Sequence, residues 1–361
     1  MIFTENYQLW DHSKFGEAFI GANTAHGFKG MTNSIISEES MKRIYVIKGA
    51  AGTGKSTLLK KIYNTATRNG IYADRYACSS DPNSLDMVVI NSQIAVLDGT
   101  APHTYDMLYP GTSSSMIDLS KFWNNKKLEN YKTDIIGSTN LKNSMYSHVY
   151  SKLHVVQMLF KERFEMISSV INNEKLERFV SRLADDICDK EVLGSTVYEY
   201  HRCISTKGRI RLNTSESKAD YIYRINDFYG SAYVFTDCLE KHLKNRGIYH
   251  QVSIDPLDSN IISEIFIPKK NILITVEQVD KSDKVINMKR FISTDKFALI
   301  KGEIRLSKKC AMTMDEEVLT YIRKAGIAHC ELEAMYSECM DYESLNEYTD
   351  YICCEILENL N

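Results

Sequence analysis

The chain has 361 residues, which is enough for two domains of ordinary size. A hydrophobic fraction of 43%, a charged fraction of 25% and a net charge of −3 are typical of a globular protein and predict no general attraction to nucleic acid or anionic membranes. The sequence has no apolar run of membrane-spanning length and no apolar core of a signal peptide near its start, and its nine cysteines form no CxxC pair. These features predict a cytoplasmic protein with reduced thiols.

The first predicted elements are a strand, RIYVIK (43–48), a glycine-rich turn and a helix from about residue 54 to residue 69. YADRYACS (72–79) predicts a second strand. DPNSLDMVV (81–89) is interpreted as the start of a short helix, and QIAVLD (93–98) as a third strand. Alternating strands and helices indicate parallel β-α-β units. A mostly helical segment is predicted over 125–190.

The turn and the start of its helix satisfy GxxxxGK[ST], the pattern of a phosphate-binding loop. Glycines let successive backbone N–H groups turn toward one point, and the helix that follows adds the positive end of its dipole. Lys55 is expected to reach the β- and γ-phosphates of ATP and to act in catalysis, while the Ser56 hydroxyl is expected to ligate Mg²⁺. The residues expected to bind the nucleotide are Gly49, Ala50, Ala51, Gly52, Thr53, Gly54, Lys55, Ser56 and Thr57.

Three side chains near strand ends are candidates for the rest of the site. Asp98 ends an apolar strand and is expected to hold Mg²⁺ through water as a catalytic carboxylate, the alternative being that it caps the following turn. Asp81 also follows a strand, but Asp81-Pro82 has the form of a helix N-cap followed by proline, so a structural role is preferred. His103, in DGTAPH, is expected to contact the γ-phosphate or a phosphoryl acceptor, or else to be an ordinary loop histidine.

The second half of the chain repeats the first. YIYRINDFYGSAYVF begins at Tyr221 as RIYVIKGAAGTGKST begins at Arg43, and two further pairs of segments follow at an offset of 177. A second helical segment is predicted over 315–358. The expected fold is α/β, with two tandem P-loop NTPase-like domains of parallel sheets, 1–190 and 191–361, each followed by a helical segment.

The phosphate-binding pattern itself does not recur. At a constant offset of 178, Asp227 replaces Gly49, Tyr233 replaces Lys55 and Val234 replaces Ser56. The segment TVEQVD (275–280), which corresponds to the Asp98 and His103 region, lacks both residues. We therefore predict one nucleotide per chain, bound in the first half, with the second half kept as a scaffold that could lend the first a residue.

Three other patterns have a simpler structural interpretation. His329 and Glu333 lie one helical turn apart, as two metal ligands can, but no further ligand accompanies them. KGRIR (207–211) is interpreted as a solvated hairpin rather than a nucleic-acid groove. The apolar spacing over residues 342–356 predicts a helix face that packs on the core.

With these motifs in place, the chain resembles an uncharacterised bacterial family of tandem P-loop ATPases. The resemblance covers most of the chain. It depends on FIGANTAHGF (19–28), YVIKGAAGTGKSTLLKKI (45–62), CSSDPNSLD (78–86), IAVLDGTAPH (94–103) and AHCELEAMYSECMDYESL (328–345). It implies two P-loop domains and nucleotide binding but no physiological substrate. Both halves of such proteins often carry the loop, and this chain departs from that pattern.

The leading expectation is therefore a Mg²⁺-dependent ATPase, slow or stimulated by a partner. P-loop hydrolases commonly place a glutamate after the metal-binding aspartate to position water, whereas Gly99 follows Asp98 here. A phosphotransferase acting on a small molecule or nucleotide is one alternative, because a positioned acceptor hydroxyl needs no such glutamate. A nucleotide-gated switch or scaffold without hydrolysis is another. A protein partner or an oligomer stays open.

Overall fold

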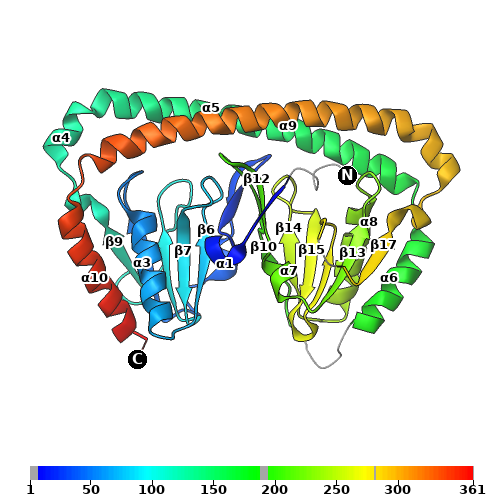
Figure 1. Ribbon diagram of the computed structural model, residues 1–361, viewed down its shortest axis with the longest axis horizontal. Coiled ribbons are helices and arrows are strands. Elements are labelled where there is room, and N and C mark those ends of the chain that lie inside the picture. The colour runs from blue at the N-terminus through cyan, green and yellow to red at the C-terminus, as the bar shows by residue number, and fades with distance from the viewer. Residues whose placement is uncertain (1–6, 188–193, 280–281, 361) are drawn as a thin grey trace.

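The computed structural model describes residues 7–187, 194–279 and 282–360 (Figure 1). The chain has an α/β fold. Two sheets lie side by side, and the long helices α5 (Lys132–Ser169) and α9 (Thr294–Ser337) run next to each other across both of them. The domain boundary expected at residue 190 lies outside the described residues.

The first sheet has six strands, and one of them runs against the others. In spatial order the strands are β2 (Ala18–Phe19), β6 (Ala73–Ala77), β7 (Leu85–Ile90), β8 (Ile94–Asp98), β5 (Arg43–Lys48) and β9 (Ser114–Asp118). All pairings are parallel except those of β7 with β6 and β8. The expected parallel sheet is thus a mixed sheet, and the short helix expected from residue 81 is wrong. All six residues of β7 are buried, and such a run does not distinguish a strand from a buried helix.

The second sheet has the same topology. Its strands, in the same spatial order, are β10 (Val197–Glu199), β14 (Gln251–Ile254), β15 (Ile262–Ile267), β16 (Ile272–Thr275), β13 (Tyr221–Asn226) and β17 (Lys284–Asn287). Here β15 is the antiparallel strand, at the position of β7. The internal repeat predicted from the sequence is therefore confirmed at the level of topology.

In chain order, a β-hairpin lies between the first two strands of each sheet. The first consists of β3 (Gly21–Thr24) and β4 (Gly27–Gly30), and the second of β11 (Arg202–Ser205) and β12 (Gly208–Leu212), with β1 (Gln8–Trp10) parallel to β12. The segment KGRIR lies in the second hairpin, but it is not solvated. Arg209 and Arg211 are buried, and Arg209 forms an ion pair with Asp315 of α9. Buried carboxylates compensate these charges, which the local sequence does not reveal.

The helical segments cross between the sheets. Helix α10 (Tyr342–Glu358), the last in the chain, packs on α3 (Lys55–Arg68) beside the first sheet, and α6 (Asn173–Ile187) packs on α8 (Ser231–Asn245) beside the second (Figure 1). Each sheet is thus covered by a helix from the other half of the sequence. The shorter helical elements are α1 (His12–Phe15), α2 (Thr32–Ile35), η2 (Leu119–Phe122), α4 (Asn125–Asn130), α7 (Thr214–Lys218), η3 (Pro268–Lys270) and η4 (Met288–Phe291).

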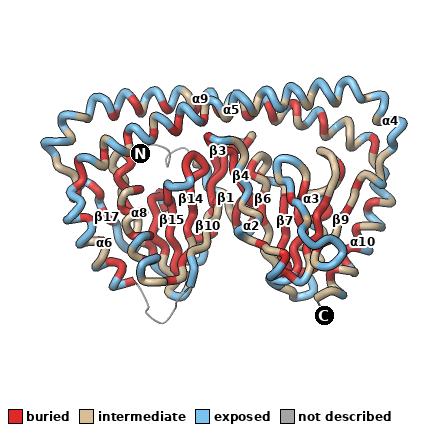
Figure 2. Tube along the Cα trace, turned by 180° about the vertical axis from the view of Figure 1, so that it is seen from behind, coloured by how far each residue is buried: buried red, intermediate tan, exposed pale blue. Residues whose placement is uncertain are grey.

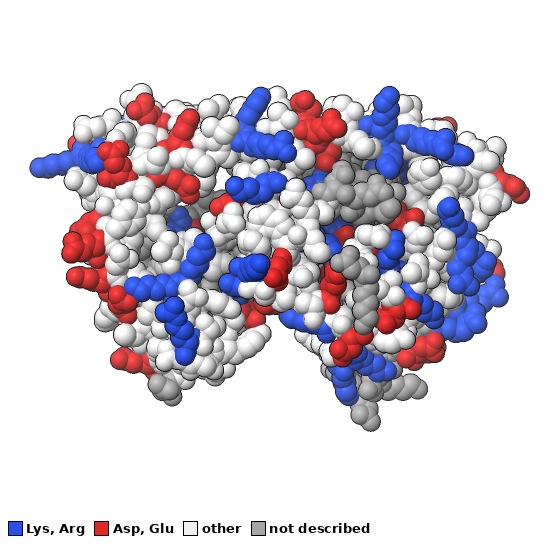
Figure 3. Space-filling view, viewed as in Figure 1, with Lys and Arg blue, Asp and Glu red and all other residues white. Residues whose placement is uncertain are grey.

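Buried residues concentrate in the strands and on the helix faces that cover them, whereas much of the outward side of α5 and α9 is exposed (Figure 2). Lys and Arg are interspersed with Asp and Glu over the described part of the face in Figure 3, as on many globular surfaces. Among the described residues, no helix combines the length and the apolar character needed to cross a membrane.

Candidate functional site

The glycine-rich loop of residues 49–54 joins the end of β5 to the start of α3. Gly52 (φ 70°) and Gly54 (φ 90°) have left-handed backbone conformations, which glycine adopts without the penalty that a Cβ imposes. Within the described residues, the backbone N–H groups of 52–57 donate to no protein acceptor. The loop and the first turn of α3 therefore present a row of free donors, as an anion site at a helix N-terminus requires.

Lys55 and Asp98, both expected in the site from the sequence, lie together at this loop. The Lys55 Nζ donates to the carbonyl of Ala50 at 2.6 Å and lies 3.6 Å from Oδ2 of Asp98. The other carboxylate oxygen of Asp98 accepts from the N–H and the hydroxyl of Thr100, which fixes the orientation of the carboxylate. Both side chains are largely buried, with 13% and 11% exposed.

Ser56 faces the sheet from the first turn of α3. Its Oγ accepts a hydrogen bond from the N–H of Leu85, at the start of β7, with a distance of 2.9 Å. A hydroxyl oxygen has two lone pairs, so one stays available for a cation. The residue is thus held in place by β7 and keeps the capacity to ligate a metal ion.

A further carboxylate, Asp86, lies beside Asp98. Strand β7 starts at the edge of the sheet where β8 ends, and the pairing of Met87 with Leu97 places Asp86 opposite Asp98. Asp86 is buried, and burial raises the pKa of its carboxyl against the opposing effect of His103. The motifs of the sequence do not reveal this residue. Its signal was a single acid inside the apolar run LDMVVI, which a buried strand tolerates only if the acid has a partner.

His103 occupies the loop after β8 and is held between two neighbours. Its Nε2 lies 3.1 Å from Oδ2 of Asp86. The ring of Phe28, in β4, meets the imidazole edge to face with 4.6 Å between ring centroids. The first hairpin therefore packs over His103 and holds it at the edge of the sheet near Asp98.

Asp81 has a structural role, although a different one from that expected. Its carboxylate accepts from the hydroxyl of Ser84 at 3.2 Å and, more weakly, from the N–H of Asn83, which makes it part of a turn rather than a helix cap. Asp258, the corresponding residue of the second half, accepts from the N–H of Asn260 at 3.0 Å. The second half keeps this acid without the phosphate-binding pattern, because both halves use the same turn.

The end of α9 and the start of α10 pack against the glycine-rich loop. A Cβ placed on Gly52 would overlap the backbone of Glu333, and the hydroxyl of Tyr342 donates to the Gly52 carbonyl at 2.8 Å. His329 forms an ion pair with Glu333 at 3.5 Å, and no third ligand of metal-binding type joins them among the described residues. The second half of the sequence thus supports the loop of the first.

A second cation, Lys142 of α5, lies within electrostatic reach of Lys55. Burial, together with the nearby ammonium of Lys55, lowers the pKa of Lys142. One turn along the same face, the hydroxyl of Tyr146 donates to the hydroxyl of Ser80 at 3.1 Å, which fixes this face toward the sheet edge. Burial also lowers the pKa of His329, and Lys142 and Lys55 add to the effect. Lys55 and Lys142 thus repel each other, and a bound polyphosphate would relieve that repulsion.

The corresponding loop of the second half is shorter than the constant offset implied. Strand β5 ends at Lys48 and α3 begins at Lys55, whereas β13 ends at Asn226 and α8 begins at Ser231, so six connecting residues become four. The positions of Lys55 and Ser56 are therefore taken by Ser231 and Ala232, not by Tyr233 and Val234 as the fixed offset predicted. A two-residue deletion is invisible to an alignment with one offset.

The four-residue loop satisfies its own donors. The carboxylate of Asp227 accepts from the N–H of Gly230 at 2.9 Å and from the N–H of Ala232 at 2.9 Å. The N–H groups of Ser231 and Tyr233 donate to loop carbonyls. A side chain of the protein thus occupies the place of an anion at this helix N-terminus.

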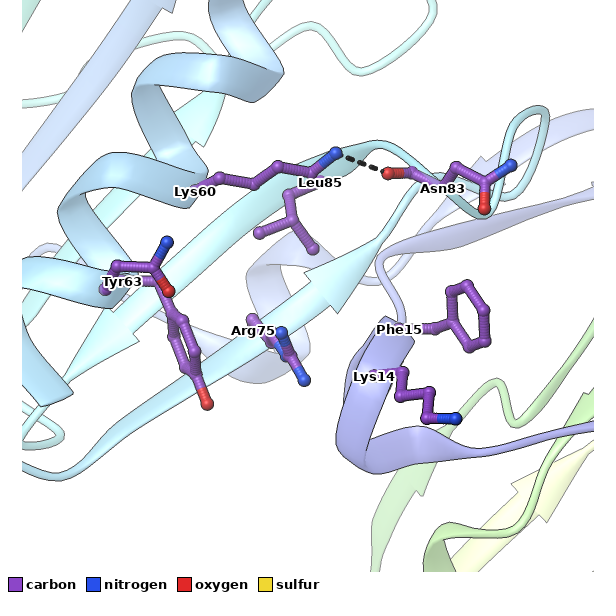
Figure 4. Close-up of a pocket in the computed structure, with 8 residues that line it drawn as sticks. Lys14, Phe15, Lys60, Tyr63, Arg75, Asn83 and Leu85 are labelled. Carbon is purple, nitrogen blue, oxygen red and sulfur yellow. Dashed lines mark hydrogen bonds between the residues drawn. The ribbon is translucent and has the colours of Figure 1, made fainter.

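A small pocket opens beside α3, away from the loop (Figure 4). Its volume is about 200 Å³, and Lys14, Lys60 and Arg75 contribute cationic side chains to its wall. The Lys60 Nζ donates to the carbonyl of Asn83 at 2.7 Å. Leu85, whose N–H binds Ser56, also lines this pocket.

Comparison with models of known protein families, with curated proteins and with solved structures gives no match. The resemblance to tandem P-loop ATPases therefore stays a prediction from the motifs. The function of this chain has to be inferred from the chemistry of its own site.

Proposed function

We propose that the chain binds Mg²⁺·ATP in residues 49–57 and hydrolyses the nucleotide slowly or with the help of a partner. The observation that carries the proposal is the row of free N–H groups at residues 52–57, next to the ammonium of Lys55. Free donors at a helix N-terminus bind phosphate, and a lysine at this position neutralises its charge. The motifs that resemble those of tandem P-loop ATPases add support.

The residues present fit both groups. In the proposal, the backbone from Gly49 to Thr57 surrounds the phosphates, and Lys55 exchanges its contact with the Ala50 carbonyl for a phosphate oxygen. Ser56 ligates Mg²⁺ with its remaining lone pair, and Asp98 holds the ion through water. Bound Mg²⁺ would neutralise charge on the phosphates. Lys142 would add a further cation from α5.

Slow turnover follows from the residue after Asp98. A Cβ on Gly99 would overlap the side chain of Val46, and the carbonyl of Gly99 accepts from Lys48 at 2.5 Å. A glutamate that positions water therefore has no room at residue 99. His103 stays a candidate for contact with the γ-phosphate or an acceptor because it is held near Asp98.

A phosphotransferase is the second candidate. The residue after Asp98 favours it, because a Cβ on Gly99 would overlap Val46 and leaves no room for a glutamate that positions water. Such a reaction needs a positioned acceptor hydroxyl and no water-activating glutamate.

Product analysis tests the proposal. The purified chain is incubated with Mg²⁺·ATP, alone and with small phosphate acceptors or cell extract, and phosphate release and transfer are both measured. We expect slow release of phosphate that Lys55→Ala abolishes and Lys61→Ala leaves unchanged. Lys61 lies on the same helix, exposed and paired with Asp350, and so controls for lost charge.

Transfer only with an acceptor would favour the phosphotransferase. Binding without turnover under every condition would favour a nucleotide-gated switch, in which the contact of Tyr342 with the loop would report the bound state. Release that survives Lys55→Ala would contradict the assignment of the loop.

A further inference from the structure

Cys78, Asp86 and His103 form a group at the strand ends of the first sheet. Each offers one atom of metal-ligand type, and these atoms all lie within 4.8 Å of one another. Cys78 directly follows β6, Asp86 lies at the start of β7 and His103 lies in the loop after β8. Because β7 is antiparallel to its neighbours, all three positions meet at the same edge.

The geometry of the group is that of side chains directed toward a common point. Nε2 of His103 lies 3.1 Å from Oδ2 of Asp86, yet this oxygen accepts no hydrogen bond of good geometry within the described residues. The Asp86 side chain is 7% exposed and that of His103 is 9% exposed. A buried carboxylate oxygen without a hydrogen bond is costly, and a shared cation would remove that cost.

We propose that Cys78, Asp86 and His103 bind one divalent transition-metal ion of the zinc type. A thiolate, an imidazole and a carboxylate are the ligands that Zn²⁺ prefers, whereas Mg²⁺ favours oxygen ligands in octahedral geometry. Three protein ligands leave the fourth tetrahedral position open to water or to a substrate oxygen. His103 would then meet a phosphate or an acceptor through the ion rather than directly.

The surroundings of the group support a built site. Phe28 packs edge to face on the imidazole and fixes the direction of the His103 ring. Asp98 lies opposite Asp86, so the ion would lie next to the site proposed for Mg²⁺·ATP. The ligand set does not depend on that proposal, since none of its members belongs to the glycine-rich loop.

The second sheet lacks the set. The pairings of Ala77 with Leu85 and of Ile254 with Ile262 align the two sheets at this edge. Asp255 then corresponds to Cys78, and Ser263 corresponds to Asp86. Only the first sheet, which also carries the loop with free N–H groups, thus has a thiol at the position of Cys78 and a carboxylate at the position of Asp86.

Another group of three, Glu177, Cys238 and His242, provides the matched control. Its carboxylate already accepts from the Cys238 thiol at 3.1 Å and interacts with the His242 imidazole at 2.7 Å, and the Glu177 side chain is 61% exposed. Water can solvate this exposed carboxylate, which therefore needs no ion. A Cys238→Ser variant therefore removes a comparable thiol without touching the proposed site.

Cobalt substitution tests the proposal directly. The full chain is stripped with a chelator and titrated with Co²⁺ while the thiolate-to-cobalt charge-transfer absorption is followed, and Zn²⁺ is then added in competition. We expect the wild-type chain to bind one Co²⁺ ion with this absorption band, and Zn²⁺ should displace that ion. In Cys78→Ser the band should be lost, and the affinity for the ion should fall by more than about tenfold. The Cys238→Ser variant should keep the band.

Two further variants exclude misleading results. His103→Ala should also lose tight binding, and the near-ultraviolet circular dichroism of each variant checks that it is folded. Lys55→Ala should keep the ion while it loses nucleotide, which separates failure of this proposal from failure of the ATP site. No charge-transfer band in the wild-type chain, or a band that survives Cys78→Ser or His103→Ala, would overturn the proposal.

Discussion

The two loops that connect a central strand to its helix, residues 49–54 and 227–230, differ in what satisfies the helix N-terminus. In the first, the N–H groups of residues 52–57 have no protein acceptor among the described residues. In the second, the Asp227 carboxylate accepts from Gly230 and Ala232. The same topology thus leaves the donors of one helix N-terminus open and satisfies those of the other with a side chain, so a repeated fold does not imply a repeated site.

The hairpins of the two halves differ in a related way. The tips match, since Thr24 donates to the carbonyl of Gly27 as Ser205 donates to that of Gly208. Counting from the tips, Gly21, Phe28 and Gly30 correspond to Arg202, Arg209 and Arg211.

Arg202 is buried in the second hairpin and pairs with Asp255 at 2.6 Å and with Glu277. Phe28 instead covers His103 in the first. The strand ends of the second sheet are thus occupied by internal ion pairs. Breaking one such pair would leave an uncompensated buried charge, so this arrangement resists the entry of a ligand.

The largest effect that sharpens this comparison is expected from Asp98→Asn. The amide keeps the size of the side chain and removes the charge that would hold Mg²⁺ through water, so Mg²⁺-dependent turnover should fall roughly 10- to 100-fold. Nucleotide binding without metal should persist. Asp118→Asn is the control, because Asp118 ends β9 on the other side of β5 and caps η2. Turnover that is lost only in Asp118→Asn would show that the metal lies on the β9 side of β5 and not at Asp98.

A smaller effect is expected from Lys142→Ala, with nucleotide affinity lower by roughly fivefold, about 1 kcal/mol. A bound phosphate favours the charged ammonium, so it should raise the lowered pKa of Lys142. Affinity in the wild-type chain should therefore fall as pH rises through that lowered pKa, below 10.5, and this component of the pH profile should vanish in the variant.

Isothermal titration calorimetry at several pH values measures both effects of Lys142→Ala. The control is Lys152→Ala. Lys152 lies further along α5 and forms an ion pair with Glu317 of α9, so its removal should change neither the nucleotide affinity nor the pH profile. Equal affinities in wild type and Lys142→Ala across the pH range would show that α5 does not contribute to the site.

In the second loop, Asp227→Ala removes the carboxylate that caps α8. We expect a loss of about 1 kcal/mol in the free energy of unfolding, measured by urea denaturation, because two N–H groups lose their acceptor. Asp237→Ala, an exposed residue paired with Lys241 on the same helix, should change the free energy of unfolding by less than about 0.5 kcal/mol. A second bound nucleotide in Asp227→Ala would show that this carboxylate alone had closed the second site.

The smallest effect is expected from Tyr342→Phe, which removes the hydroxyl bound to Gly52. The partly exposed contact should contribute about 0.5 kcal/mol, and nucleotide affinity should change by no more than about twofold. Tyr351→Phe, on an exposed face of α10, is the control for denaturation and binding experiments. A large loss of nucleotide affinity in Tyr342→Phe would mean that α10 affects nucleotide binding by more than one hydrogen bond can explain.

Local sequence patterns predicted the elements next to the loop. The strand at 43–48 has the expected bounds, and the helix expected over 54–69 occupies Lys55–Arg68, because a buried strand and an amphipathic helix each have a strong local signal. The loop residues, Lys55 and Asp98 followed from their spacing, and the structure brings Lys55 and Asp98 together.

The features that were missed depend on partners far along the chain. The residues of β7 alone predict a helix, because its neighbours β6 and β8, not its own residues, decide the conformation of a fully buried run. Asp86 belongs to the same run. The burial of Arg209 depends on Asp315, more than a hundred residues away, and the shortened second loop needs the ends of β13 and α8 to be known.

Equilibrium binding of a non-hydrolysable ATP analogue with Mg²⁺ tests the central claim most directly, since the account requires one open loop per chain. Isothermal titration calorimetry should give a stoichiometry near one, unchanged in Asp227→Ala and lost in Lys55→Ala. A stoichiometry near two in the wild-type chain, or binding that survives Lys55→Ala, would contradict the claim that the first loop alone is open to nucleotide.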